Sequence, residues 1–403
     1  MVATVRHPWR GLALGICLGL GACAGNFGIG QKEDDRAVRG GDLNLKPIGF
    51  SSLAGWSGDD HAAAFRAFRI SCQKLDKQAS AANGKNSRLD PALLDACRRA
   101  LALGPKVSRA AARDFFEQAF TPHEITAPRP DGLLTSYFEP VLEGSRKPGN
   151  GFEVPIYRRP DDLMLLSPSS QRGTRNAQMT AMRKTSNGSE PYPTRQDIEQ
   201  GALKGRGLEI LYLKDHVDAY IMHIQGSARI RLGDGQKVRI GFAAKNGYPY
   251  TSIGKALIDQ GEIDAAKMSM QRMKAWLRAN PEKAKRVMWK NRSFIFFREL
   301  DEGVGDDGPI GAQGVSLSAG RSLAVDTGFH SLGTPIWVKV PGLAVGGKSY
   351  ARLMIAQDVG SAIQGPERGD IYWGSGVKAG RAAGKIKYPG SFVVLVPNTR
   401  AYR

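Results

Sequence analysis

The sequence predicts a mainly β protein with a helical N-terminal part. From residue 133 onward, short runs rich in β-branched and aromatic residues recur between Gly, Pro and Asp. Before that point, apolar residues instead repeat at the spacing of an α-helix. Many short strands separated by turns favour β-barrels, and 403 residues that are 41% hydrophobic suffice for two domains with buried cores.

The N-terminus has the pattern of an exported lipoprotein. Two arginines precede an apolar run that ends at Ala22 and is too short to cross a bilayer, which indicates a cleaved signal. The Gly-Ala pair before Cys23 resembles the lipobox of bacterial lipoproteins, with an ordinary signal peptide as the alternative. We expect a lipoprotein signal over residues 1–22, lipidation at Cys23 and a tether over residues 23–45. The absence of Asp after Cys23 resembles lipoproteins anchored to the outer membrane, which implies a periplasmic location.

Three helices are expected between the tether and the first strand. Apolar residues at helical spacing place them at 65–75, 90–101 and 108–120, with Asp or Ser at their starts as N-caps. Cys72 and Cys97 lie on the apolar sides of the first two helices. In an oxidising compartment such a pair tends to form a disulfide, and two buried thiols are the alternative.

The later strands are expected where β-branched and aromatic residues gather, at 133–138, 154–157, 217–224, 237–242, 293–298, 335–340, 352–356 and 391–396. Two kinds of segment interrupt them. Residues 164–195 are rich in Ser, Arg, Asn and Gln, which predicts a mobile surface loop. Helical spacing returns at 253–259 and 264–279, where Asn280 and Pro281 end the second helix.

The charge balance indicates an anionic partner. There are 57 Lys and Arg against 38 Asp and Glu, a net charge of +19, which attracts polyanions. The basic residues are dispersed and no nucleic-acid-binding motif appears, so we exclude nucleic acid and retain peptidoglycan and anionic lipid. The six His residues are scattered without metal-ligand spacing, so we expect no metal and no cofactor.

Three acids differ from the other charged residues. Asp326, Asp358 and Asp370 each adjoin an apolar or Gly-rich segment, as expected for side chains at the mouths of strands. A proton donor to a glycosidic oxygen needs a carboxyl group whose pKa is raised by its surroundings, which makes these acids the candidates. For Asp326 and Asp358 the alternative is that each caps a turn by binding backbone amides.

Several motifs together resemble a known family. They are TSYFEP at 135–140, VPIYRRPDDL at 154–163, HIQGSARIRL at 223–232, KNGYPYTSIGK at 245–255 and GDIY at 369–372. The C-terminal part, 322–388, resembles the 3D domain, named for three aspartates. The whole mature chain resembles the membrane-bound lytic murein transglycosylase A family. Ser136, His223 and Ala228 depart from the residues usual in that family, outside the GDIY motif.

The resemblance implies a double-psi β-barrel interrupted by a smaller β-barrel domain, with a glycan groove between the two. The barrel is expected over residues 46–140 and 291–403, and the insertion over residues 141–290. The implied reaction is cleavage of the bond between MurNAc and GlcNAc in peptidoglycan without water, which leaves a 1,6-anhydro ring. We expect a monomer whose partners are glycan strands and, through its lipid, the outer membrane.

By the same resemblance Asp370 is the catalytic acid, Asp358 its neighbour, and Asp326 the first of the three aspartates. Candidates for contact with the sugars are Tyr137, Tyr250 and Tyr372 by stacking, and Gln225, Ser227 and Asn246 by hydrogen bonds. For each aromatic residue, packing inside the protein is the alternative.

Two rival functions remain open at this stage. One is a hydrolase in which Asp370 is the acid and Asp358 or Asp326 is the base that activates water. The other is a lipoprotein that binds glycan without turnover.

Overall fold

The computed structural model describes residues 43–81, 89–126, 132–166, 179–301 and 308–398. The expected signal, Cys23 and nearly all of the expected tether lie outside the described residues. No helix within the described ranges is long and apolar enough to span a bilayer.

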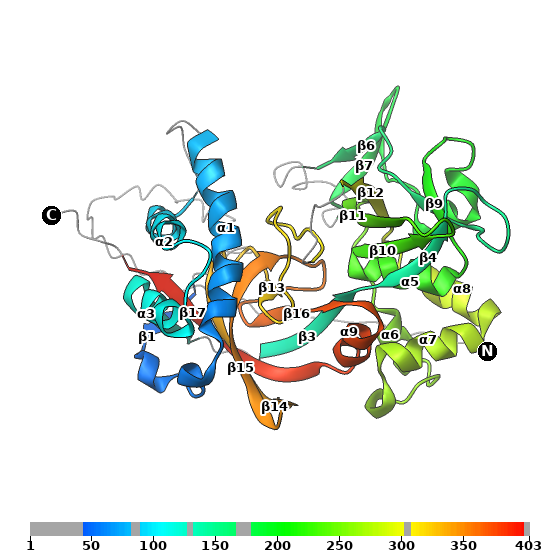
Figure 1. Ribbon diagram of the computed structural model, residues 1–403. Helices are drawn as coiled ribbons and strands as arrows, with labels where there is room; N and C mark the ends of the chain where they lie inside the picture. The colour runs from blue at the N-terminus through cyan, green and yellow to red at the C-terminus, as the bar shows by residue number, and fades with distance from the viewer. Residues whose placement is uncertain (1–42, 82–88, 127–131, 167–178, 302–307, 399–403) are drawn as a thin grey trace, which may run out of the picture. The chain divides into compact units, whose positions relative to one another are not determined.

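The N-terminal part is helical, as predicted. Its helices are α1 (His61–Ala81), α2 (Pro91–Ala102) and α3 (Arg109–Ala119), preceded by short 3-10 turns at Phe50–Ser52 and Trp56–Gly58. They pack together beside the strands (Figure 1). Asp90 and Ser108 cap α2 and α3 by accepting backbone N–H groups. A disulfide joins Cys72 of α1 to Cys97 of α2.

The main sheet has eight strands: β1 (Leu45–Pro47), β2 (Phe120–Ile125), β3 (Gly132–Glu139), β13 (Ser322–Ala324), β14 (Pro335–Val345), β15 (Lys348–Asp358), β16 (Arg368–Ser375) and β17 (Lys387–Pro397). The strand order is β1-β2-β17-β14-β15-β13-β16-β3, and β17 also pairs with β3. Hydrogen bonds therefore run in a closed ring from β17 through β14, β15, β13, β16 and β3 back to β17, so the sheet forms a barrel. Apolar side chains of these strands, among them Leu134, Ile336 and Ile371, form its core.

A second sheet is built from the segment between β3 and β13. Its strands are β4 (Val141–Ser145), β5 (Val154–Tyr157), β9 (Glu209–Leu213), β10 (Ser227–Leu232), β11 (Lys237–Lys245) and β12 (Ile295–Leu300), in the order β12-β11-β10-β4-β9-β5. The helices of this segment are α5 (His216–Gln225), α6 (Ile253–Asp259), α7 (Met270–Ala279) and α8 (Pro281–Trp289). Because β12 pairs with β11, this sheet continues past residue 290, where we had expected the insertion to end.

The prediction of a strand at 217–224 was wrong, because these residues form α5. The Asp215 side chain accepts the Val217 N–H, and Gly226 ends the helix in the left-handed region at φ 78°. The helix lies between two cores: Met222 packs in one and Tyr220 in the other. A helix buried on both sides lacks a polar face, so its apolar run is hard to distinguish from a buried strand.

The prediction of a loop over 164–195 was also wrong for much of its length. The structure has a three-stranded sheet of β6 (Leu163–Leu165), β7 (Ala181–Thr185) and β8 (Gly188–Glu190), followed by α4 (Arg195–Asp197) and a π-helical turn at Ile198–Ala202. Met179 and Tyr192 are buried in this region. The remainder of the predicted loop, residues 167–178, lies outside the described residues.

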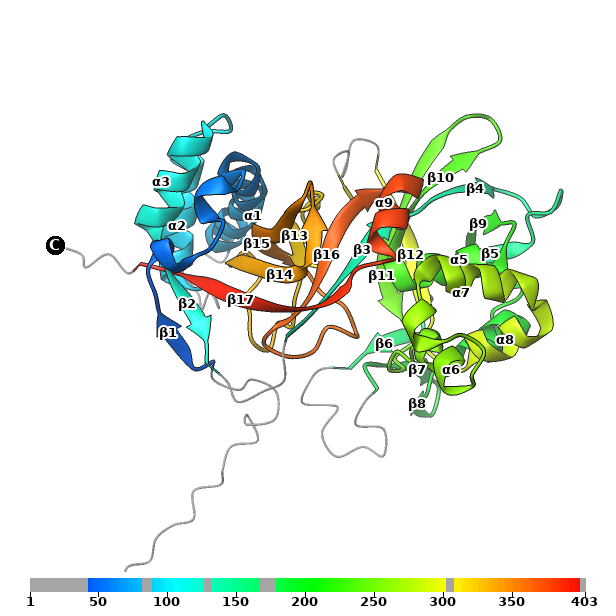
Figure 2. The same ribbon diagram turned by 90° about the horizontal axis from the view of Figure 1, so that it is seen from below.

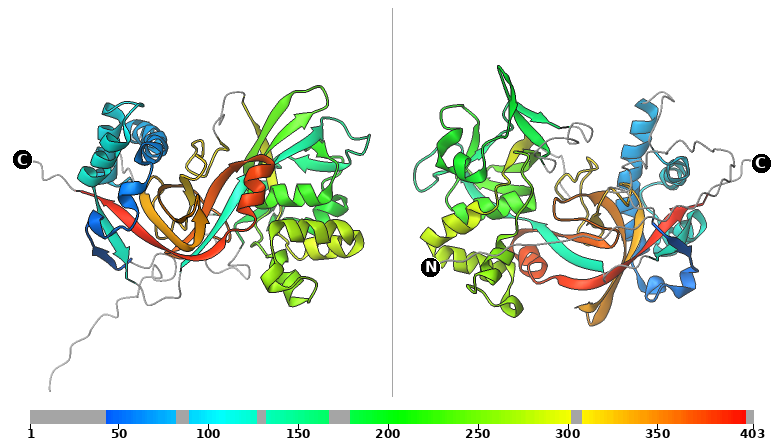
Figure 3. Two further views of the ribbon diagram at one scale, coloured as in Figure 1. Left: turned by 60° about the horizontal axis from the view of Figure 1, so that its bottom comes forward. Right: turned by 180° about the vertical axis from the view of Figure 1, so that it is seen from behind.

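The predicted helix at 264–279 begins later than expected. Residues Ala265–Lys267 form a separate 3-10 turn, and α7 starts at Met270 because the Ser269 hydroxyl accepts the Arg272 N–H. The last helix, α9 (Gly376–Ala383), follows β16. It lies beside β3 and β16 (Figures 2 and 3). The approach is close enough that a Cβ at Gly380 would lie 2.6 Å from the Phe138 ring.

Candidate functional site

Strand register brings Asp358 and Asp370 together. Ala324 of β13 pairs on one side with Asp358, at the end of the parallel strand β15, and on the other with Asp370 of the antiparallel strand β16. The two carboxyl groups interact electrostatically, and both side chains are half-buried. An acid pair at the end of the barrel strands is therefore the candidate active site.

Alternate residues of β3 point their polar groups toward this site. Thr135 Oγ1 donates a hydrogen bond to Asp370 Oδ1 at 2.6 Å. The Tyr137 hydroxyl donates to Asp358 Oδ2, also at 2.6 Å. Glu139 continues the series with a cluster of its own, described below. Because side chains two positions apart share one face of a strand, β3 supplies a polar edge to both acids.

The surroundings of Asp370 favour its protonated form. Burial raises the pKa of its carboxyl group to about 6, against the opposing effects of the Thr135 hydrogen bond and the Arg368 guanidinium. The negative charge of Asp358 adds a smaller part of this rise. Arg368 is also tied to the site, because its Nη2 donates to Thr135 Oγ1 at 2.9 Å. Asp370 is thus suited to donate a proton near neutral pH.

Asp358 is held by more hydrogen-bond donors than Asp370. Its Oδ1 accepts the backbone N–H groups of Ala312 and Val359, each at 2.9 Å, in addition to the Tyr137 bond on Oδ2. Burial raises the pKa of Asp358, and these three donors oppose that rise by stabilising the carboxylate. Donors arranged in this way stabilise a negative charge beside Asp370.

Asp326 is placed differently from the other two acids. Its Oδ1 accepts the Gly328 N–H at 2.9 Å and its Oδ2 accepts the Gly365 N–H at 2.8 Å. This is the turn-capping arrangement that the sequence left open as the alternative. Asp326 also lines a pocket of about 620 Å³ with Val359 and Ser361, which follow Asp358, and with Lys245 and Tyr250 of the second sheet's segment.

The residues expected to contact sugars separate into two groups. Tyr250 lines that pocket, and Gln225 accepts the Phe138 N–H at 2.9 Å, which connects α5 to β3. Tyr372, Asn246 and Ser227 are buried, which leaves little exposed surface for the contact with a glycan that we expected of them.

Their positions explain their burial. Asn246 binds the carbonyl oxygens of Pro193 and Arg292 and the Phe294 N–H, so its amide joins three segments. Tyr372 packs against Tyr137 with ring centroids 5.5 Å apart, and its hydroxyl lies 3.0 Å from Ser375 Oγ. The ring of Tyr372 thus supports the ring of Tyr137.

A buried ion cluster lies where β3 passes into the second sheet. Glu139 accepts hydrogen bonds from Arg229, Arg239 and Ser375, and its side chain has no exposed surface. The arginines belong to β10 and β11, whereas Ser375 belongs to β16. One carboxylate therefore connects the barrel to the inserted sheet, close to the strand that carries Thr135 and Tyr137.

Sequence reasoning missed Thr135, Arg368, Lys245 and Glu139 as site residues. For β3 there was a usable signal: polar groups recur at every second position, at Thr135, Tyr137 and Glu139, which indicates one polar face. No comparable signal marks Arg368 or Lys245, because their neighbours come from distant strands.

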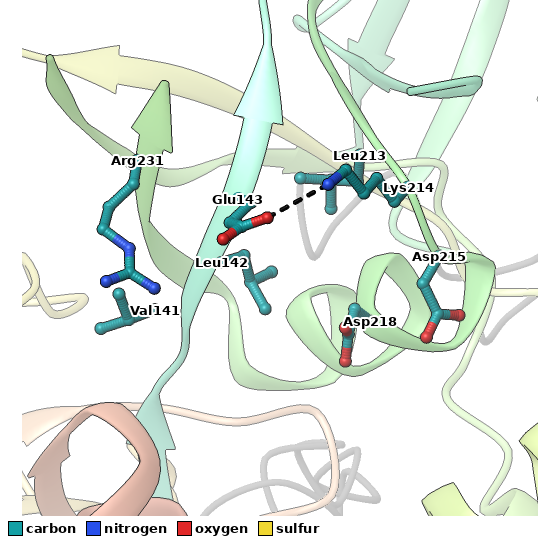
Figure 4. A pocket seen from close by; sticks show the side chains of 8 residues that line it. All are labelled: Val141, Leu142, Glu143, Leu213, Lys214, Asp215, Asp218 and Arg231. Atoms are coloured by element: carbon teal, nitrogen blue, oxygen red, sulfur yellow. Dashed lines mark hydrogen bonds and ion pairs between the residues drawn. The ribbon is translucent and has the colours of Figure 1, made fainter. Parts of the chain in front are cut away.

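A smaller pocket of about 250 Å³ lies beside β4 and α5 (Figure 4). Four of its charged residues already have partners: Lys214 pairs with Glu143, and Asp215 and Asp218 pair with Arg278. It contains neither acid of the candidate site. Among the described residues no cluster of three or more His, Cys, Asp or Glu is placed to hold a metal ion.

Two protein families match successive parts of the chain. The family described as "MltA specific insert domain" matches residues 133–298, and the family described as "3D domain" matches residues 321–396. The first match covers β3 and nearly all of the second sheet, whereas the match to the 3D domain covers the segment that contains all three aspartates. Both halves of the chain thus match domains that carry the site residues.

Individual relatives give the same result. The membrane-bound lytic murein transglycosylase A of Vibrio cholerae is 34% identical over 265 residues, which are 64% of this chain and 63% of that protein. A crystal structure of the membrane-bound lytic murein transglycosylase from Agrobacterium tumefaciens is 37% identical with a TM-score of 0.78, covering 88% of this chain and 97% of that one. The structure of Escherichia coli MltA with bound chitohexaose is 27% identical with a TM-score of 0.60, covering 90% and 94%.

The similarity to the Vibrio cholerae protein spans less than two thirds of that protein's length, whereas the similarity to the Agrobacterium structure spans nearly all of it. Both domain matches follow one another in the order that the fold requires. The chain therefore belongs to the membrane-bound lytic murein transglycosylase A family.

Proposed function

We propose that this protein is a lytic transglycosylase that cleaves peptidoglycan glycan strands between MurNAc and GlcNAc, with Asp370 as its acid and base. The observation that carries the proposal is the placement of Asp370, whose carboxyl group has a pKa of about 6 beside the hydrogen-bonded carboxylate of Asp358. The names of the relatives support the substrate class, and the Escherichia coli relative binds chitohexaose, a β-1,4-linked sugar chain.

The first step breaks the glycosidic bond. Protonated Asp370 donates its proton to the oxygen that links MurNAc to GlcNAc, and the bonding electrons leave with that oxygen. GlcNAc departs with a free hydroxyl group while positive charge develops at the anomeric carbon of MurNAc. The Asp358 carboxylate stabilises this charge electrostatically.

The second step closes a ring within the substrate. The Asp370 carboxylate takes the proton from the C6 hydroxyl of the same MurNAc, and the C6 oxygen attacks the anomeric carbon. The product is a 1,6-anhydro sugar, Asp370 is protonated again, and no water is consumed. Because the nucleophile belongs to the substrate, one carboxyl group suffices, and the reaction gains from proximity.

The same proposal extends to the fold and the location. The parallel pairings of β13 with β15 and of β16 with β3 inside the closed ring support a double-psi barrel. We place the insertion between the two parts of that barrel, with the glycan in a groove that includes the pocket at Asp326. The lipobox-like segment supports a lipid anchor at Cys23 in the outer membrane, and we propose that the protein acts as a monomer.

The decisive experiment is mass spectrometry of isolated sacculi digested with the protein from Lys46 onward, beside Asp370→Asn. Anhydro-muropeptides from the unmodified protein alone are the expected result. Products with reducing ends would instead mean hydrolysis, with Asp358 activating water. If Asp370→Asn were as active as the unmodified protein, the proposed role of Asp370 would be refuted. If the unmodified protein were folded but released no products, a glycan-binding function would be favoured.

A further inference from the structure

Lys245 places a positive charge in the pocket that Asp326 lines. It is the last residue of β11, and its Nζ donates to Ser361 Oγ at 3.2 Å. Ser361 belongs to the segment that follows Asp358, so this contact joins the second sheet to the loop that leaves the active site. The pocket of about 620 Å³ that Lys245 lines is also lined by Val325 and Val359, which directly follow Ala324 and Asp358, so it borders the segments that carry the acid pair.

Lys245 forms no ion pair with a carboxylate among the described residues, in contrast to several other lysines. Lys214, Lys255, Lys274 and Lys283 each lie within 3.2 Å of an Asp or Glu oxygen. Lys245 is half-buried, and burial alone lowers the pKa of its amino group, with no acid opposing the effect.

The acid that shares the pocket is already engaged. Both side-chain oxygens of Asp326 accept backbone N–H groups, from Gly328 and Gly365. A partly desolvated ammonium group offers three donors and no acceptor, so the ligand that fits Lys245 best supplies carboxylate or carbonyl oxygens. Tyr250 borders the same space and offers an aromatic surface beside it.

We propose that Lys245 binds the carboxyl group of the lactyl ether on MurNAc and thereby selects MurNAc over GlcNAc at the acid pair. The inference rests on the proposed function, because it assumes that a peptidoglycan sugar occupies the site. The two sugars of the strand differ only in this lactyl group, which carries either a free carboxylate or the amide carbonyl that joins the stem peptide. Either form presents oxygen acceptors to the ammonium group, and the free carboxylate adds an opposite charge.

The test measures binding without turnover, in the Asp370→Asn background. Titration calorimetry compares a peptide-free tetrasaccharide of alternating GlcNAc and MurNAc with chitotetraose, which lacks lactyl groups. We expect Asp370→Asn to bind the MurNAc ligand about tenfold more tightly, a typical effect of one charge-assisted hydrogen bond. Adding Lys245→Met should abolish the preference without weakening chitotetraose binding, and Lys245→Arg should retain part of it.

A matched control is Lys255→Met in the same background, because Lys255 is exposed and paired with Asp259. It should leave both affinities unchanged. A preference for MurNAc that survives Lys245→Met would overturn the proposal. An equal loss of affinity for both ligands would also overturn it, because Lys245 would then have a structural role only. A third ligand with stem peptides attached should show a smaller Lys245-dependent loss, since an amide carbonyl replaces the carboxylate.

The failure of this inference and the failure of the proposed function are separable. The identity of the products formed from sacculi by the unmodified protein reports on the reaction. The ligand preference of the Asp370→Asn variants reports on Lys245, whatever the products are.

Discussion

At the scale of single residues, Asp370 links the reaction to the stability of the protein. Burial raises the pKa of its carboxyl group to about 6, above the value of about 3.9 in an unfolded chain. Between these values the folded state binds more protons than the unfolded state, so stability falls as pH rises through this window. Above pH 6 the folded protein carries the full cost of the buried charge.

At pH 7.5 we therefore expect Asp370→Asn to be more stable than the unmodified protein by up to about 2 kcal/mol in unfolding free energy, once partial exposure is allowed for. The variant should accordingly unfold at a higher temperature. The difference should vanish near pH 3, below both pKa values, where the carboxyl group is largely protonated in both states. Thermal unfolding across this pH range measures it. A difference that is independent of pH would show that the Asp370 charge is not its source.

Tyr137 should control the protonation state of Asp358. Its hydroxyl opposes the rise in the pKa of Asp358, so Tyr137→Phe should raise that pKa further. The acid limb of the pH–rate profile should then move to higher pH. On the alkaline limb Asp358 is already ionised, so the limb set by Asp370 should stay in place and the profile should narrow from the acid side. An unchanged profile with a uniformly lower rate would mean that Tyr137 only packs against Tyr372.

At the scale of secondary-structure elements, the buried Glu139 holds β3 to strands β10, β11 and β16. Glu139→Gln removes the charge but keeps the shape, which leaves the mostly buried Arg239 without its carboxylate. We expect a loss of about 3–5 kcal/mol in unfolding free energy, measured by denaturant titration. Glu143→Gln is the matched control on the next strand, because the Glu143–Lys214 pair is exposed and should contribute less than about 1 kcal/mol.

The disulfide between α1 and α2 should stabilise the helical part. Its cysteines lie 25 residues apart and are fully buried, and removing such a cross-link typically costs about 2–4 kcal/mol. The double variant Cys72→Ala, Cys97→Ala should therefore melt at a lower temperature than the oxidised protein. Added reductant should lower the melting temperature of the unmodified protein and leave that of the double variant unchanged. The prediction would be contradicted if reductant left the melting temperatures of both proteins unchanged.

The helical part also reaches the active site through buried polar contacts. Ser71 of α1, next to Cys72, donates to Gln313 and accepts from Gln357, the neighbour of Asp358. Gln313 follows Ala312, whose N–H binds Asp358. The helices thus support the backbone that presents Asp358, in addition to covering the barrel.

At the scale of the whole molecule, the net charge of +19 should govern attraction to the cell wall. Adsorption of Asp370→Asn to isolated sacculi should weaken as salt rises from 50 to 500 mM, roughly as the Debye length shortens. Binding to neutral chitin should change little over the same range, which serves as the control. Equal salt dependence on both polymers would show that wall carboxylates are not the attractant.

Local pattern predicted much of this molecule. The N-terminal helices, most of the strands and the acid at GDIY follow from periodicity and from motifs confined to a few neighbouring residues. What the sequence did not reveal depends on register and burial. The side chains of Tyr372 and Asn246 are buried in the fold. Thr135 lies next to Asp370 only because β3 and β16, which are distant in sequence, pair in this register. Helix α5, buried on both sides, lost the polar face that would have identified it.

The pairing of β3 with the last strands has a consequence for how the chain is made. Thr135 and Asp370 lie 235 positions apart, so β3 emerges from the ribosome long before β16 and β17 exist to cover its edges. Contacts over such separations form slowly, and an open strand edge invites pairing with other chains. The final strands therefore complete the barrel and the acid site in one event. A nascent chain stopped before β16 has neither, and cannot cut the wall while it is still being synthesised.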